Sequence, residues 1–208
     1  MRIELQNVAK RYKLEWVLRH VNLDLRVGNG FAITGPNGSG KSTLMKILSG
    51  HLSPSKGTIQ FYKQDKKLPS EEIYRHLSFA APYIDLIEEF TLAEALQFHQ
   101  KFKSFINNQS AAEMIALLGF ERAKNKPIRH FSSGMKQRLK LVLAICSDTP
   151  LLLLDEPTAT LDRQGIGWYQ ELIRQFVSQN RLIVVASNVE EDFFFCEKRI
   201  DILNFKQK

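Results

Sequence analysis

Hydrophobic positions along the chain switch between two spacings, which predicts an α/β protein. Apolar or alternating runs predict strands at FAITG (31–35), TIQFY (58–62), LLLL (151–154) and RLIVVAS (181–187). Helical spacing, with Ser, Thr or Gly at the expected ends, covers STLMKILSG (42–50), TLAEALQFHQKFKSF (91–105), SAAEMIALLGF (110–120) and SGMKQRLKLVLAICS (133–147). This order predicts one domain over residues 1–208 with a helical insertion near 91–130.

The aromatic run Phe193–Phe195 stands between charged residues. We expect it to pack a C-terminal helix on the core, because large aromatic side chains are usually buried.

Composition limits the class of protein without choosing a function. A length of 208 residues, 44% hydrophobic and 25% charged, suits one well-buried soluble domain. No apolar run approaches the roughly 18 residues that span a bilayer. The two cysteines form no disulfide framework. The net charge of +7 is spread among acidic residues and forms no basic block, so we expect no nucleic-acid partner.

The segment GPNGSGKST (35–43) carries the first chemistry. It matches G-x-x-x-x-G-K-[ST] in full and lies between a predicted strand and a predicted helix. Gly38 and Gly40 let backbone amides turn toward phosphate oxygens at the helix N-terminus. Lys41 supplies a charge to the β- and γ-phosphates and Ser42 a hydroxyl to Mg²⁺. The segment predicts a nucleotide site.

Two carboxylates, Asp155 and Glu156, follow the apolar run LLLL directly. They therefore stand at the carboxyl end of a buried strand, where open α/β sheets bind ligands. Asp155 is placed to hold the water shell of Mg²⁺. Glu156, one residue later, is placed to accept a proton from an attacking water. The alternative is that both acids cap the next helix.

Four elements in order, GPNGSGKST, FSSGMKQR (131–138), LLLLDEPTA (151–159) and TLD (160–162), resemble the nucleotide-binding domain of ABC ATPases. The resemblance implies a P-loop NTPase (RecA-like) α/β core with a mainly parallel sheet. It also implies an N-terminal antiparallel β-subdomain and a helical signature subdomain at about 91–140. The ATP-binding positions would be Tyr12, Gly35, Pro36, Asn37, Gly38, Ser39, Gly40, Lys41, Ser42 and Thr43, with Mg²⁺ at Ser42 and Asp155.

In that family two domains pair head to tail around two ATP molecules. The signature residues, here Ser132, Ser133 and Gly134, contact the γ-phosphate held by the other subunit. Ser133 replaces a glycine, and a left-handed backbone there would cost about 1–2 kcal/mol. Asp162 looks like the D-loop aspartate that links the two sites.

The adenine base needs a flat partner. Tyr12 matches the family's stacking aromatic, and Trp16 is the alternative.

Two positions depart from the family pattern. Pro82 or Tyr83 stands where a glutamine normally reports the γ-phosphate, and Asn188 stands where a switch histidine is expected. Asparagine can donate a hydrogen bond to phosphate but cannot carry a positive charge. With the base Glu156 present, we expect an active but slow ATPase.

The resemblance implies the ATP-hydrolysing subunit of an ABC transporter, with ATP and Mg²⁺ as cofactors. Its partners would be a transmembrane permease subunit and a second ABC subunit, in a homodimer or heterodimer. It would be cytoplasmic, held on the inner face of the membrane by the permease. Two alternatives stay open: a soluble ABC protein acting on the ribosome or DNA, and a regulatory nucleotide-gated dimer with weak or no ATPase.

Overall fold

The computed structural model describes residues 1–28 and 30–206, which form two compact units. The first comprises Met1–Phe79, Pro150–Glu156 and Ser178–Lys208. The second comprises Ala80–Thr149 and Pro157–Val177. No helix in the described ranges combines the length and the apolarity needed to cross a bilayer.

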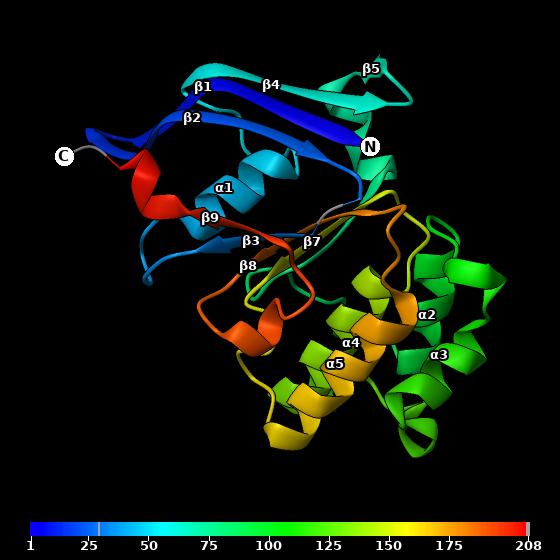
Figure 1. Cartoon of the computed structure of the whole chain (residues 1–208). Coiled ribbons are helices and arrows are strands. Elements are labelled where there is room, and N and C mark those ends of the chain that lie inside the picture. The colour runs from blue at the N-terminus through cyan, green and yellow to red at the C-terminus, as the bar shows by residue number, and fades with distance from the viewer. Residues whose placement is uncertain (29, 207–208) are drawn as a thin grey trace. The chain divides into compact units, whose positions relative to one another are not determined.

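The first unit contains an antiparallel sheet ordered β2-β1-β4-β5 (Figure 1). Its strands are β1 (Arg2–Tyr12), β2 (Glu15–Arg26), β4 (Lys56–Lys63) and β5 (Lys66–Leu68). Alternate residues of β1, such as Ile3 and Leu5, are buried while their neighbours are more exposed. This period of two is that of a strand with one covered face. The predicted N-terminal antiparallel β-subdomain is confirmed.

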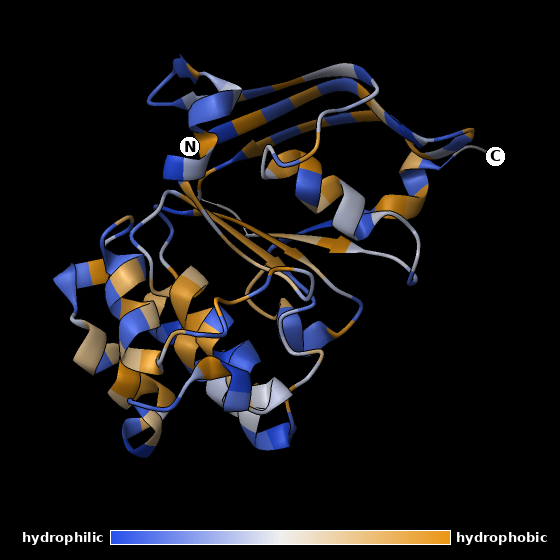
Figure 2. Cartoon of the chain, turned by 180° about the vertical axis from the view of Figure 1, so that it is seen from behind, coloured by the Kyte–Doolittle hydropathy of each residue, from blue (hydrophilic) through white to orange (hydrophobic). Residues whose placement is uncertain are grey.

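A second sheet, ordered β6-β7-β8-β3-β9, carries the predicted parallel core. Its strands are β3 (Gly30–Thr34), β6 (Leu77–Ala80), β7 (Leu151–Asp155), β8 (Leu182–Ala186) and β9 (Lys198–Asp201). The pairs β7–β8, β8–β3 and β3–β9 are parallel. Every residue of β7 and β8 is buried, as continuous apolar runs predict, and these central strands are mostly orange in Figure 2. The α/β class is confirmed.

Helix α1 (Lys41–Leu48) joins both sheets of the first unit into one core. Its Leu44, Met45, Ile47 and Leu48 belong to a single cluster with side chains from β1, β2, β3, β7 and β8. Three short 3-10 helices, η1 (Ser70–Arg75), η5 (Glu190–Asp192) and η6 (Ile202–Phe205), complete the unit. The core fixes the strand ends and the start of α1, which carry the predicted site.

The second unit is helical. Its helices are α2 (Leu92–Gln100), α3 (Ala111–Leu118), α4 (Ser133–Ile145) and α5 (Arg163–Phe176), with short 3-10 turns η2 (Ile106–Asn108), η3 (Glu121–Ala123) and η4 (Ile128–His130). The predicted Ser/Thr N-caps of α2 and α3 are Thr91 and Ser110, and in the structure each forms a full capping box.

Helix α2 ends at Gln100, earlier than the predicted 105. Tertiary pairing explains the difference: Ile106 N donates to Cys146 O at 2.8 Å, and Asp148 N donates to Ser104 O at 2.9 Å. These bonds draw the chain after α2 into an extended path beside the end of α4.

The expected C-terminal helix at Phe193–Phe195 is wrong. The run lies in turns between η5 and β9. Phe193 is buried, but Phe194 is 42% exposed. Phe193 therefore packs in the core, Phe195 is half-buried, and Phe194 faces outward.

Candidate nucleotide-binding site

Three strands of the first unit end at the same level. Ala186 of β8 is in register with Asp155 of β7 and with Ile33 of β3. Glu156 N donates to Ala186 O at 2.8 Å, and Ser187 N donates to Ile33 O at 3.1 Å. The residues that follow each strand are therefore neighbours at one edge of the sheet, although they lie far apart in the sequence.

The loop after β3 has the shape that anion binding needs. Gly35, Gly38 and Gly40 have φ of 138°, 75° and 103°, in the left-handed region that favours glycine. A Cβ on Gly40 would lie 2.9 Å from Val17 Cγ1, so only glycine fits. No side chain caps the N-terminus of α1, and its first turn contains no acidic residue. The first amides of α1 are thus open to an anionic ligand such as a nucleotide phosphate.

Lys41 is buried at the centre of this site, at 4% exposure. Its Nζ donates to Gly35 O at 2.7 Å and to Pro36 O at 3.4 Å. The same nitrogen lies 4.0 Å from Glu156 Oε1. The carbonyls carry no charge, and the carboxylate of Glu156 is at the longest distance that counts as an ion pair. The buried Lys41 ammonium can therefore bind an additional anion.

A hollow of about 390 Å³ opens over the loop. It is lined by Val17, Asn37, Gly38, Gly40, Lys41, Ser42, Thr43 and Glu156. Sequence reasoning missed Val17; the only signal was its place in a strand-like segment before the loop.

The two adjacent acids differ in their surroundings. Asp155 is 1% exposed, whereas the Glu156 side chain is 36% exposed and lines the hollow. Glu156 has φ of 46°, and such a backbone costs a non-glycine residue about 1–2 kcal/mol. The alternative that these acids cap the next helix fails, because Asp162 caps α5. Strain of this kind is characteristic of functional positions.

Asn188 follows β8 and contacts the phosphate loop. Its Oδ1 accepts a hydrogen bond from Gly35 N at 3.0 Å, and its Nδ2 lies 3.4 Å from Asn37 Oδ1. Ser187 Oγ accepts from Val189 N at 3.0 Å and thereby shapes this turn. The asparagine amide holds the first glycine of the loop, a contact that the sequence did not indicate.

Neither of the two candidate aromatics lines this hollow. Tyr12, at the end of β1, is 45% exposed with Lys10 Nζ 5.5 Å from its ring centroid. An extra residue on β2, Val17, lies between the pairs Arg11–Trp16 and Lys10–Leu18. Such a bulge redirects side chains: Val17 contacts the phosphate loop, and Trp16 lines a different hollow.

The signature residues gather in the second unit. A hollow of about 230 Å³ is lined by Phe120, Ser132, Gly134, Met135, Arg138, Thr160, Leu161 and Asp162. Ser132 caps α4 by accepting from Met135 N at 3.2 Å. Ser133 begins the helix with ordinary helical geometry, so the strain considered for a left-handed serine is absent. Arg138, which the sequence did not single out, stacks on Trp168 at 5.1 Å.

Pro82 and Tyr83 lie in the turn after β6. Pro82 O accepts a hydrogen bond from Lys140 Nζ of α4 at 3.3 Å, within the second unit. Tyr83 is 39% exposed.

Comparison with known proteins agrees with this geometry. The family model described as ABC transporter matches residues 18–159. The lantibiotic transport ATP-binding protein SrtF of Streptococcus pyogenes is 33% identical over 192 residues, covering 90% of this chain and 80% of SrtF. The cytochrome c biogenesis ATP-binding export protein CcmA of Brucella abortus (strain 2308) is 30% identical over 191 residues, covering 91% of this chain and 86% of CcmA.

A solved structure extends the likeness to three dimensions. The dimeric ATP-binding cassette MJ0796, in a post-hydrolysis state bound to ADP and Pi, is 27% identical to this chain. The match covers 96% of this chain and 93% of that one, with a TM-score of 0.81. The chain belongs to the ABC transporter family, in which it is an ATP-binding subunit of the ATPase class.

Proposed function

We propose that residues 1–208 act as one nucleotide-binding domain that hydrolyses ATP to drive a separate permease subunit. The convergence at one sheet edge of the phosphate loop, Asp155 with Glu156, and Asn188 is the observation that carries this proposal. These groups include the cation, the amides and the carboxylates that phosphoryl transfer to water requires.

The roles follow from the chemistry of each group. Lys41 and the amides of Gly38 and Gly40 bind the β- and γ-phosphates, which compete with the carbonyls that now hold the lysine. The hydroxyl of Ser42 and the carboxylate of Asp155 are the hard oxygen ligands that Mg²⁺ prefers. Bound there, Mg²⁺ would neutralise charge on the phosphate oxygens. Phosphate oxygens of the nucleotide would complete this site.

Glu156 is the general base of the proposed mechanism. Its partly exposed carboxylate lines the hollow, where a water can reach it. It would take the proton of that water as the oxygen attacks the γ-phosphorus, while the bond from the γ-phosphorus to the β,γ-bridging oxygen breaks and ADP leaves. Asn188 fixes the loop through Gly35, and its NH₂ group, which lies 3.4 Å from Asn37 Oδ1, is the donor that it would offer to a phosphate oxygen. Tyr12 remains our choice for stacking on adenine.

Dimerisation completes the proposed site. MJ0796 is a dimeric cassette, which supports a homodimer here or a heterodimer with another ABC subunit. Ser132, Ser133 and Gly134 at the start of α4 would face the γ-phosphate of the other subunit, where helix N-terminal amides favour negative charge. Asp162 lines the same hollow as Ser132 and Gly134, which suits a link between the two sites.

The test compares Glu156→Gln with Glu171→Gln. Glu171, on α5, has an exposed side chain and serves as the matched control. Glu156→Gln should abolish steady-state phosphate release and should shift the protein toward dimer on size exclusion with Mg-ATP, because bound ATP is no longer consumed. Glu171→Gln should behave like the parent. Hydrolysis that survives in Glu156→Gln would contradict the assigned base.

The permease is expected to dock on an aromatic surface of the second unit, formed by Ile87, Phe90, Phe98 and Phe102. Phe98 packs edge-on against Phe90 at 5.3 Å and against Phe102 at 5.0 Å, yet Phe102 remains 72% exposed. Exposed apolar clusters of this kind mark protein interaction sites. Docking there would hold the chain on the inner face of the membrane.

Co-purification with a tagged candidate permease tests this surface. The double variant Phe98→Asp/Phe102→Asp should lose the permease while keeping ATP binding. Leu203→Asp changes a comparably exposed apolar residue of the first unit and should retain it. Equal retention by both variants would show that the permease binds elsewhere.

A nucleotide-gated dimer with weak turnover is the second candidate. It is favoured by the contact of the Asn188 carbonyl with Gly35, and by Pro82, whose side chain has no donor. Both features weaken the positioning of the attacking water, and positioning accounts for much of phosphoryl-transfer catalysis.

A further inference from the structure

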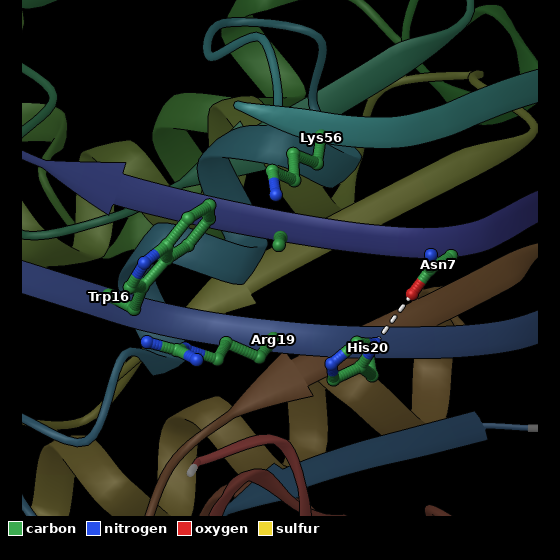
Figure 3. Close-up of a pocket in the computed structure, with 6 residues that line it drawn as sticks. Asn7, Trp16, Arg19, His20 and Lys56 are labelled. Carbon is green, nitrogen blue, oxygen red and sulfur yellow. Dashed lines mark hydrogen bonds between the residues drawn. The ribbon is translucent and has the colours of Figure 1, made fainter.

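A second hollow in the first unit has no place in the proposed ATP chemistry. It measures about 250 Å³ and is lined by Asn7, Ala9, Trp16, Arg19, His20 and Lys56 of β1, β2 and β4. Figure 3 shows Arg19 and Lys56 extending toward the Trp16 ring. It shares no lining residue with the hollow over the phosphate loop. We call it the Trp16 hollow.

Three cations surround the Trp16 ring. Arg11 Cζ, Arg19 Cζ and Lys56 Nζ lie 5.3, 5.0 and 5.3 Å from its centroid. The electron-rich face of an indole attracts cations, which accounts for each contact singly. The three positive charges repel one another, however, and a bound anion would relieve that repulsion.

No carboxylate within the described ranges forms an ion pair with these three cations. The same sheet satisfies other arginines: Arg2 and Arg26 both pair with Asp24, at 2.7 and 2.6 Å. The lack of an acid at Trp16 is therefore a local feature of the hollow.

Arg19 has unused donor capacity. Its Nε is buried and has no hydrogen-bond acceptor in the described part of the protein. Leaving such a donor unbonded is costly, and the planar guanidinium fork matches the oxygens of an oxyanion. The hollow thus leaves a buried donor without an acceptor.

The backbone around the hollow is built into an irregular shape. Asn7 and His20 both have positive φ, 48° and 53°, and the β1–β2 register shifts at Leu5/Val8 and again after Val8. Side chains hold this shape: Asn7 N donates to Asn22 Oδ1 at 2.8 Å, and His20 Nδ1 lies 2.7 Å from Asn7 Oδ1 (Figure 3). Strained residues at paired bulges are typical of functional positions.

We propose that the Trp16 hollow binds a phosphate group with at least two negative charges, carried by a small metabolite or by a lipid headgroup. Arg19 and Lys56 bind its oxygens, and Arg11 adds charge from beside the ring. Three fixed positive charges call for more than the single charge of a carboxylate, and the arginine fork suits phosphate geometry. Ala9, which pairs with Lys56 across β1 and β4, lines the hollow with a small side chain, so a larger side chain at this position would take up part of its volume. The hollow is an additional ligand site, separate from ATP hydrolysis.

Trp16 provides the readout for a test. The chain has two tryptophans, so Trp168→Phe leaves Trp16 as the only one. Adding Lys41→Ala silences the phosphate loop. In this protein, titration with inorganic pyrophosphate at constant ionic strength should change Trp16 emission in a saturable way, with a midpoint of about 1 mM or below.

Matched variants distinguish binding at this specific hollow from a general effect of surface charge. Arg19→Gln/Lys56→Gln should raise the midpoint at least about tenfold, since charge-assisted hydrogen bonds are lost. Ala9→Leu fills the hollow without changing charge and should abolish saturation. Lys63→Gln/Lys66→Gln removes equal charge elsewhere on the sheet and should leave the midpoint within about twofold. Thermal unfolding confirms that each variant is folded.

The source of the phosphate follows from a parallel titration with phosphatidylcholine vesicles, with and without phosphatidic acid. A response to pyrophosphate assigns a soluble ligand, and one confined to phosphatidic acid assigns a lipid headgroup; both support the site. An unsaturable response, an equal loss in Lys63→Gln/Lys66→Gln, or a signal that needs Lys41 would overturn the proposal. So would saturation by single-stranded RNA alone, which would identify a nucleic-acid surface.

Discussion

Replacing Asn188 tests whether this residue positions the loop, the phosphate, or both. Asn188→Ala removes the acceptor of the Gly35 N–H bond and the nearby amide donor together. A typical hydrogen bond contributes about 1 ± 0.5 kcal/mol, and about 1.4 kcal/mol in the transition state is a factor of ten. We therefore expect the alanine variant to hydrolyse ATP about 2- to 12-fold more slowly.

Asn188→His should act in the opposite direction. A neutral imidazole can accept from Gly35 N through one nitrogen and donate to phosphate through the other, and its protonated form adds a positive charge. A gain of about 1.4 kcal/mol in the transition state would raise the rate about tenfold. The affinity for ATP should change much less than the rate, because the added contact is made mainly as charge develops on the γ-phosphate.

Steady-state phosphate release at saturating Mg-ATP measures these rates, with Glu156→Gln as the inactive reference. Equilibrium binding of a fluorescent ATP analogue separates affinity from turnover. Two outcomes would refute the reasoning: an unchanged rate in Asn188→Ala, or a slower rate in Asn188→His. A parent rate equal to that of Glu156→Gln would instead favour the nucleotide-gated dimer without turnover.

Three other changes test separate parts of the structure. Lys41→Ala should abolish binding of the fluorescent ATP analogue, because it removes the charge that holds the β- and γ-phosphates; retained affinity would contradict the phosphate loop. Glu156→Gly should be more stable than Glu156→Ala by roughly 1 kcal/mol in urea unfolding, because glycine relieves the φ of 46°; an alanine variant of equal stability would exclude strain. Burial, with a smaller effect of Lys103, lowers the pKa of His99 from 6.5 to about 4. Below pH 6.5 the unfolded chain binds a proton that the native state does not, so stability should fall by about 1.4 kcal/mol per pH unit down to pH 4. His99→Gln should remove that part of the pH dependence of the urea midpoint, and an identical dependence in both proteins would contradict it.

The hydrogen bonds around His99 also define the tautomer of its neutral ring. Ser147 Oγ donates to Leu143 O at 2.6 Å, so it accepts from His99 Nε2 at 2.7 Å. The ring also stacks on Phe105 at 5.5 Å. A second proton, on Nδ1, would place a charge in this packed setting.

Local patterns in the sequence were sufficient to predict those elements and motifs that depend only on residues close together in the chain. The spacing of GPNGSGKST specifies a glycine-rich turn before a helix, because backbone freedom at Gly38 and Gly40 is a property of those residues themselves. The runs at β7 and β8 are continuous and apolar because both faces of these strands are covered. The capping boxes at Thr91 and Ser110 close within one turn, so they too could be recognised from sequence.

The tertiary structure decided the features that join distant segments. Asn188 and Gly35 meet only because β8 and β3 pair in a particular register, which no local pattern encodes. Strand β9 (KRID, Lys198–Asp201) has no strong alternation of apolar and polar residues, yet it forms a strand because it pairs in parallel with β3. The bulge at Val17 directs Trp16 away from the phosphate loop and into a cluster of cations drawn from three strands. Strand register and bulges arise from packing over the whole core, and a one-residue slip of any of these strands would change the contacts that its side chains make.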